Sequence, residues 1–189
     1  MRLEVQDPRN DIIKATLRSR SLQIHGAIDH DVLSNLHASL TYLKNRSQTA
    51  PVEITLFTSG GDLDSALAIH DLIRYYHRKL PIIITACGRC MSAGIIVLLG
   101  AHRRMSMPNA RFMVHEATVT LSGSISQNDQ NAQEGKRIQA AVNDLISKHT
   151  KIDLLGLRKK MGSGLDHFYS AKEALEVGLV HGIVGEKTR

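Results

Sequence analysis

Residues 81–94 read PIIITACGRCMSAG, and this stretch decides the fold class. Its first six residues form a continuous apolar run, which predicts a strand in a sheet that is covered on both faces. The next four, Cys87 to Cys90, are expected to form a turn, and a helix from about Ser92 to Leu99 follows. A buried strand that leads at once into a helix is typical of α/β proteins.

The same alternation continues on both sides of this stretch. Upstream, helices are expected at 11–20, at about 30–45 and after Asp62 or Asp64, and strands at 21–25 and from 52 to the glycines at 60 and 61. Downstream, strands are expected near 104–107 and 111–115, joined by a turn at 108–109, and a capping box opens a short helix over 170–178. We therefore predict one α/β domain over residues 1–189 with a mostly parallel central sheet.

Residues 126–149 predict a long and mostly polar helix. Its apolar side chains, among them Ile138, Val142 and Ile146, gather in the C-terminal half. The N-terminal half is too polar to be buried by this chain alone. We therefore expect the helix to project and to pair with another subunit.

The composition is that of an ordinary globular protein. The chain has 189 residues, of which 42% are hydrophobic and 22% are charged. No apolar run reaches the roughly 18 residues that a membrane-spanning helix needs. The first seven residues carry acidic groups and lack the apolar segment of a signal peptide. We therefore expect a cytoplasmic protein without a membrane anchor.

The formal net charge of +6 does not by itself indicate a nucleic-acid-binding protein. The basic residues are scattered, and pairs such as Arg103-Arg104 and Lys159-Lys160 are short. Aromatic residues make up only 4% of the chain, which leaves few platforms on which bases could stack. We expect a solvated basic surface and no nucleic-acid partner.

Several groups that suit acyl transfer follow neighbouring strands, at the edge of a parallel sheet where ligands bind. Ser92 begins a helix, and its hydroxyl becomes a nucleophile when a base takes its proton. His115 ends the 111–115 strand and is the candidate base, and Asp166 is the candidate third group. Gly61 and Ala93 are placed to offer backbone N–H groups to a substrate carbonyl, as an oxyanion hole.

Each of these residues also has a purely structural interpretation. Two glycines after a strand usually form a turn, a serine at a helix start is usually a cap, and a histidine at a strand end is usually structural. The C-x-x-C pair Cys87 and Cys90 suggests redox chemistry or zinc binding, but zinc needs two more ligands that do not stand out in the sequence. Two buried thiols beside Ser92 are the simpler interpretation, and we predict no metal site.

Longer motifs around these residues resemble one family. Residues 88–94, GRCMSAG, resemble G-x-A-A-S-M-G; residues 107–115, MPNARFMVH, resemble L-P-N-S-R-x-M-I-H; and residues 166–171, DHFYSA, resemble D-x-F-M-S-A. In this order, and with the glycines at 60 and 61, they resemble the proteolytic subunit of the Clp protease, the ClpP family of serine peptidases. The resemblance implies the ClpP fold, which is related to the crotonase fold, with a projecting handle helix.

The resemblance also implies roles and partners. It makes Ser92 the nucleophile, His115 the general base, Asp166 the orienting carboxylate, and Gly61 and Ala93 the oxyanion-hole donors. Residues 116–149 match the handle that joins two seven-membered rings, so that the active sites face an enclosed chamber. Unfolded polypeptides would be the substrates. A partner AAA+ unfoldase would deliver them and use the ATP, and this chain would need no cofactor.

Some positions depart from the family pattern. Ser59 replaces the usual proline before the two glycines. Thr55, Thr85 and Cys87 replace large apolar residues that usually line the unfoldase docking pocket, which predicts a departure from the usual unfoldase partner. A disulfide between Cys87 and Cys90 is a further hypothesis, since it would strain the turn that holds Ser92 and lower activity.

Two alternatives for the function stay open. Residues 57–63, FTSGGDL, resemble the oxyanion loop of crotonases, which act on acyl-CoA, although the chain is short for that family. A non-catalytic ring subunit would have the same fold, but such subunits usually lack a triad member. A serine–lysine peptidase is a weaker alternative, because we find no catalytic lysine in a matching place.

Overall fold

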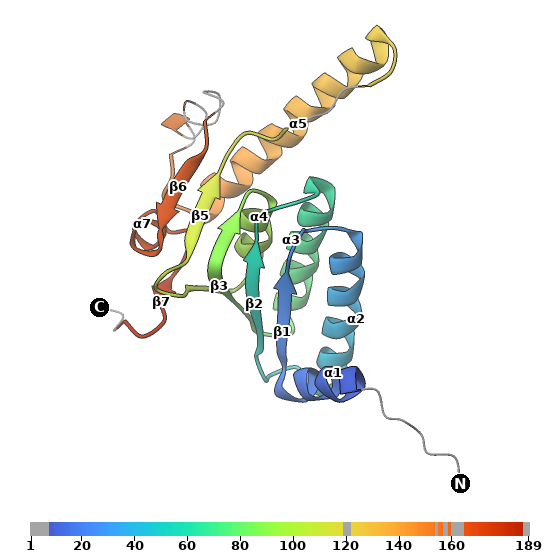
Figure 1. The fold of residues 1–189 in the computed structure, drawn as a ribbon, viewed down its shortest axis with the longest axis vertical. Coiled ribbons are helices and arrows are strands. Elements are labelled where there is room, and N and C mark those ends of the chain that lie inside the picture. The colour runs from blue at the N-terminus through green and yellow to red at the C-terminus, as the bar shows by residue number, and fades with distance from the viewer. Residues whose placement is uncertain (1–7, 119–121, 154, 157–158, 160–164, 187–189) are drawn as a thin grey trace.

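A mostly parallel sheet forms the centre of the molecule (Figure 1). The structure is a computed structural model that describes residues 8–118, 122–153, 155–156, 159 and 165–186. The strands of this part are β1 Ser21–His25, β2 Val52–Thr58, β3 Ile82–Met91, β4 Arg103–Ser106, β5 Arg111–Val114, β6 His167–Ser170 and β7 Gly182–Ile183. Their order is β1-β2-β3-β4-β7, all parallel, and β5 pairs in parallel with β3 and antiparallel with β6. The predicted α/β fold class is confirmed.

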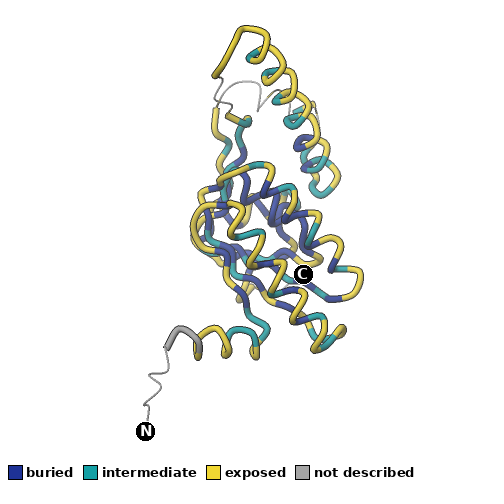
Figure 2. Tube along the Cα trace, turned by 90° about the vertical axis from the view of Figure 1, so that its right-hand side faces the viewer, coloured by how far each residue is buried: buried dark blue, intermediate teal, exposed yellow. Residues whose placement is uncertain are grey.

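Helices α2, α3 and α4 lie on one face of this sheet (Figures 1 and 2). The helices include α1 Pro8–Ser19, α2 His30–Arg46, α3 Leu63–His77, α4 Ala93–Leu99, α5 Ile125–His149 and α7 Ala171–Glu176. Asp62, rather than Asp64, caps α3, since its carboxylate accepts a hydrogen bond of 2.7 Å from the Ser65 amide. Within the described part of the chain, every helix is too short or too polar to cross a lipid bilayer.

Strand β3 is longer than predicted, and it changes its neighbour halfway along. Its first half pairs with β4 over 83–86, and its second half pairs with β5 over 89–91. Between the two halves the register with β2 shifts, and Gly88 has a φ of +65°. The turn predicted for residues 87–90 is therefore wrong, because the chain passes through this irregularity without leaving the sheet.

The prediction that the sheet is covered on both faces is also wrong. Ile82, Ile84 and Ala86 of β3 are buried under the helices, whereas Ile83 and Thr85, which point to the other face, are only half-buried. β-Branched residues suit a half-buried sheet surface as well as a buried one. An unbroken apolar run therefore does not distinguish the two cases.

The predicted long helix is α5, which projects from the body of the molecule (Figures 1 and 2). Ser124 and Gln127 form a capping box at its start. Ile125, at the projecting end, is 83% exposed, while Val142 and Ile146 are buried where the helix joins the sheet. The clustering of apolar residues in the C-terminal half thus decides which part of the helix packs against its own chain.

Arg104, which the sequence analysis assigned to a solvated basic surface, is buried and 5% exposed. Its guanidinium group donates hydrogen bonds of 2.8–2.9 Å to the carbonyls of Leu179, His149 and Gly178. These carbonyls belong to the C-terminal end of α5 and to the segment between α7 and β7. The Arg104 side chain therefore connects β4, the end of α5 and the segment between α7 and β7, which are distant from one another in sequence.

We expect Arg104→Met to lower the free energy of unfolding by about 3 kcal/mol, because it leaves buried carbonyls without donors. Arg103→Met is the matched control, since Arg103 is the exposed neighbour on the same strand; its effect should stay within about 0.5 kcal/mol. Urea unfolding followed by circular dichroism measures both. Equal effects of the two substitutions would contradict the anchoring role of Arg104.

His149, at the C-terminal end of α5, is expected to make the fold sensitive to acid. Burial, and then the nearby charges of His70, Arg104 and Arg74, lower the pKa of His149 from 6.5 to about 4. The unfolded chain therefore binds this proton more readily, so stability is full above pH 6.5 and falls as the pH drops towards 4. The ring is partly exposed, so we expect a loss of about 1 kcal/mol.

Urea unfolding of the native protein and of His149→Gln, between pH 7 and pH 4.5, measures this contribution. The variant should lose less stability across this range than the native protein. The control is the same substitution at His30, an exposed residue at the start of α2. A His149→Gln variant with an unchanged pH dependence would contradict the assignment.

Candidate active site

Ser92 lies at the junction between β3 and α4 in a backbone conformation that serine rarely adopts. Its φ is 54° and its ψ is −125°, which costs on the order of 1–3 kcal/mol for a residue with a Cβ. Its amide donates a hydrogen bond of 2.8 Å to the carbonyl of Met113 in β5, which holds this conformation. Its hydroxyl makes no capping hydrogen bond within the described residues. The interpretation of Ser92 as a simple helix cap is therefore wrong.

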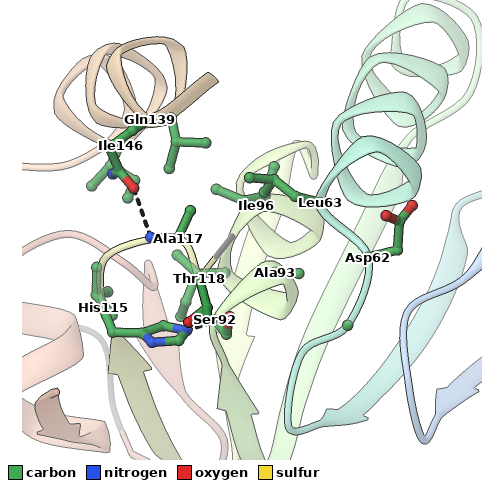
Figure 3. Close-up of a pocket in the computed structure, with 14 residues that line it drawn as sticks. Asp62, Leu63, Ser92, Ala93, Ile96, His115, Ala117, Thr118, Gln139 and Ile146 are labelled. Carbon is green, nitrogen blue, oxygen red and sulfur yellow. Dashed lines mark hydrogen bonds between the residues drawn. The ribbon is translucent and has the colours of Figure 1, made fainter. Parts of the chain in front are cut away.

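His115 follows β5 and points at Ser92 (Figure 3). Its Nε2 lies 2.7 Å from the Ser92 Oγ. The two residues meet because β5 pairs with the last residues of β3, so the two segments leave the sheet side by side. With the proton of the imidazole on Nδ1, the Ser92 hydroxyl donates to Nε2, which is the arrangement that a base needs.

Asp166 lies on the other side of the His115 ring. Strand β6 pairs antiparallel with β5, with His167 opposite Val114, so the next pair in the same register is Asp166 and His115. The Asp166 Oδ1 lies 3.7 Å from the His115 Nδ1, an ion-pair distance that is longer than a hydrogen bond. The Asp166 side chain is 49% exposed. The sequence pattern does not indicate β6, the strand that brings Asp166 to this place.

Gly60 and Gly61, after β2, are glycines because other groups approach them closely. A Cβ on Gly60 would lie 2.7 Å from the Ser92 Cβ, and a Cβ on Gly61 would lie 2.3 Å from the Ile28 carbonyl oxygen. Both contacts are shorter than any that real Cβ atoms make. The two glycines therefore do more than form a turn: Gly60 lets the backbone pass next to the Ser92 side chain, and Gly61 lets it pass next to the Ile28 backbone.

A cavity of about 380 Å³ opens beside these residues (Figure 3). Gly61, Ser92, Ala93 and His115 all line it. Ala93 is the first residue of α4, so its amide has no acceptor inside the helix. The remaining wall is mostly apolar and comes from α3, α4, β5 and α5, with Leu63, Ile96, Val114, Val142 and Ile146 among its side chains.

Gln139 of α5 is a cavity residue that sequence reasoning missed. Its Oε1 accepts a hydrogen bond of 2.7 Å from the Ala117 amide (Figure 3). Its Nε2 donates a hydrogen bond of 2.9 Å to the Oδ1 of Asn143. Asn143 is 7% exposed. The spacing of four residues between these two amides was a possible signal, because it places them on one helix face. The contact connects α5 to the segment that directly follows His115.

The two cysteines lie on β3, where both thiols are free. Cys90 is fully buried, and burial raises the pKa of its thiol, which opposes the thiolate that redox chemistry requires. Cys87 is half-buried. The turn that the disulfide hypothesis invoked is replaced by strand. Among the described residues, no three His, Cys, Asp or Glu side chains lie close enough together to hold a metal ion.

Comparisons with known proteins agree with one another. The family model described as Clp protease matches residues 4–187. The chain is 29% identical over 184 residues to the ATP-dependent Clp protease proteolytic subunit 2 of Treponema denticola, covering 94% of this chain and 89% of that protein. It is 26% identical over 178 residues to the ATP-dependent Clp protease proteolytic subunit of Deinococcus radiodurans, covering 93% and 85%.

A solved structure is similar over the same extent. The fold matches a mutant ClpP1 from Listeria monocytogenes with a TM-score of 0.80 and 26% identity, covering 93% of this chain and 97% of that chain. Because the family model spans nearly the whole sequence, the match applies to the sheet, the site and the projecting helix together. The chain belongs to the Clp protease family, a family of serine peptidases.

Proposed function

We propose that this chain hydrolyses peptide bonds of unfolded polypeptides, with Ser92 as nucleophile, His115 as general base and Asp166 as orienting carboxylate. The observation that carries the proposal is the distance of 2.7 Å between the Ser92 Oγ and the His115 Nε2, at the edge of a cavity. A serine becomes nucleophilic when a base in hydrogen-bond contact accepts its proton.

Each residue has a defined role in the proposed reaction. The Ser92 Oγ attacks the peptide carbonyl while its proton moves to the His115 Nε2, and the amides of Gly61 and Ala93 bind the oxyanion that forms. His115 then gives its proton to the leaving amine, and an acyl ester on Ser92 remains. His115 next takes a proton from a water molecule, which hydrolyses the ester. Asp166 stabilises the imidazolium, and the distance of 3.7 Å shortens as that charge forms.

The proposed assembly rests on α5 and on the names of the relatives. The projecting half of α5 is exposed and mostly polar, so packing against its own chain does not stabilise it, and pairing with another subunit would. Relatives are named as proteolytic subunits of ATP-dependent proteases. We therefore propose a cytoplasmic homo-oligomer of stacked heptameric rings without cofactor, metal, nucleic acid or membrane. A separate AAA+ unfoldase uses ATP and delivers substrate.

Replacement of Ser92 tests the catalytic role directly. Ser92→Ala should lower the hydrolysis of a fluorogenic peptide by at least about 1,000-fold, because no other group replaces the nucleophile. Assembly, measured by size exclusion with light scattering, should not change. Ser19→Ala, a substitution in the exposed C-terminal end of α1, is the control and should keep full activity.

The result also separates the proposed peptidase from the non-catalytic ring subunit. An assembled native protein without measurable hydrolysis would favour the ring subunit. A Ser92→Ala variant that retains activity would show that another group carries out the reaction.

A further inference from the structure

Thr58, the last residue of β2, is fully buried, and the mechanism above assigns it no role. Its Oγ1 accepts a hydrogen bond of 2.9 Å from the Gly60 amide and donates one of 3.2 Å to the Gly60 carbonyl. A buried hydroxyl costs stability unless it is hydrogen-bonded. Both of these hydrogen bonds are made to the loop that carries the Gly61 donor.

These contacts fix the direction of the Gly61 amide. The Gly60 carbonyl accepts hydrogen bonds from the Thr58 hydroxyl and from the Ile28 amide, the latter at 2.9 Å. The described peptide bonds are all trans, and in a trans peptide the C=O and the following N–H point in opposite directions. The Gly61 N–H therefore points away from the Ile28 amide. The preceding residue, Gly60, lies so close to Ser92 that a Cβ on it would meet the Ser92 Cβ at 2.7 Å.

The methyl group of Thr58 contacts the second oxyanion element. A Cβ on Gly94 would lie 2.3 Å from the Thr58 Cγ2, so this methyl packs directly on the first turn of α4. Ala93, the second proposed donor, is the neighbour of Gly94 in that turn. One buried side chain thus contacts both segments from which the donors arise.

Ser59 increases the need for such a restraint. It is exposed, and serine does not fix its own φ as a proline would. It precedes two glycines, which have the greatest backbone freedom of all residues. The Thr58 hydroxyl, and the Ile28 amide on the same carbonyl, limit this freedom.

We propose that Thr58 is a positioning residue: its hydroxyl orients the Gly61 donor, and its methyl group sets the place of the Ala93 turn. The inference rests on the proposed function, since it presumes that these amides bind the oxyanion. An oriented donor acts on the charge that develops in the transition state, so Thr58 should affect kcat and leave KM nearly unchanged.

Two pairs of variants isolate the hydroxyl. Native Thr58 and Thr58→Val differ by replacement of the hydroxyl with a methyl group, and Thr58→Ser and Thr58→Ala differ by one oxygen atom. We expect kcat for a fluorogenic peptide to fall about 10- to 100-fold within each pair, up to the loss seen when an oxyanion donor is removed. KM should change less than about 3-fold. Thr58→Ser keeps the hydroxyl but loses the methyl group that packs on the Ala93 turn, so its kcat should lie between those of the native protein and of Thr58→Ala.

Two further readouts separate positioning from a general structural effect. The affinity for a peptide boronate, which forms a tetrahedral adduct with the serine, should fall in parallel with kcat/KM. Thr41→Val is the matched control, because the Thr41 hydroxyl is also hydrogen-bonded, to the Tyr76 hydroxyl at 2.7 Å, and neither residue lines the cavity; kcat should not change. Thermal unfolding and light scattering verify that each variant is folded and assembled. If Thr58→Val does not fold, the Ser and Ala pair decides.

The outcomes distinguish this inference from the proposed function. Native activity that depends on Ser92, together with equal kcat values in both pairs, would overturn the role of Thr58 alone. Losses of kcat that only parallel a lower melting temperature would also overturn the role of Thr58. A fall in kcat/KM that comes from a higher KM would overturn it as well. An absence of Ser92-dependent hydrolysis in the native protein would overturn the proposed function, and this inference with it.

Discussion

The strained backbone of Ser92 is the constraint on which the rest of the site depends. A residue with a φ of 54° at the end of a strand turns the chain sharply into α4 and leaves its side chain on the cavity. The conformation persists because its surroundings hold it: the Met113 carbonyl binds its amide, and every residue of α4 behind it is buried. The stability of the core thus maintains a local geometry that is unfavourable by itself.

This constraint also explains why the neighbouring segments have their sequences. Gly60 is a glycine because the Ser92 side chain leaves no room for a Cβ. β3 passes from β4 to β5 through the irregularity at Gly88, and this change of neighbour brings His115 next to Ser92. Asp166 depends on β6, a strand of four residues that pairs with β5, and its contact with His115 is the longest in the set. The distance between Ser92 and His115, which the buried strands β3 and β5 hold, is therefore shorter than the distance between His115 and Asp166.

Much of the fold could be predicted from the sequence because its signals are local. Helical spacing predicts α2, caps predict the starts of α3 and α7, and β1 has the predicted bounds of Ser21–His25. The failures share a cause, namely contacts with residues distant in the sequence. Arg104 is buried because the carbonyls that bind it come from residues 149–179. The irregular path of β3 depends on β2 and β5, and β6 is too short and too exposed to have a clear pattern. Local motifs predict the candidate catalytic residues, and the structure brings these residues together: Ser92, His115 and Asp166.

The most direct test of this account is the reactivity of Ser92 itself. Intact-mass analysis after treatment with a fluorophosphonate, applied to the native protein and to Ser92→Ala, reports an activated serine without any assumption about the substrate. The account predicts one adduct per chain in the native protein and none in the variant. An unlabelled native protein that is folded and assembled, or an adduct that persists in the variant, would contradict it.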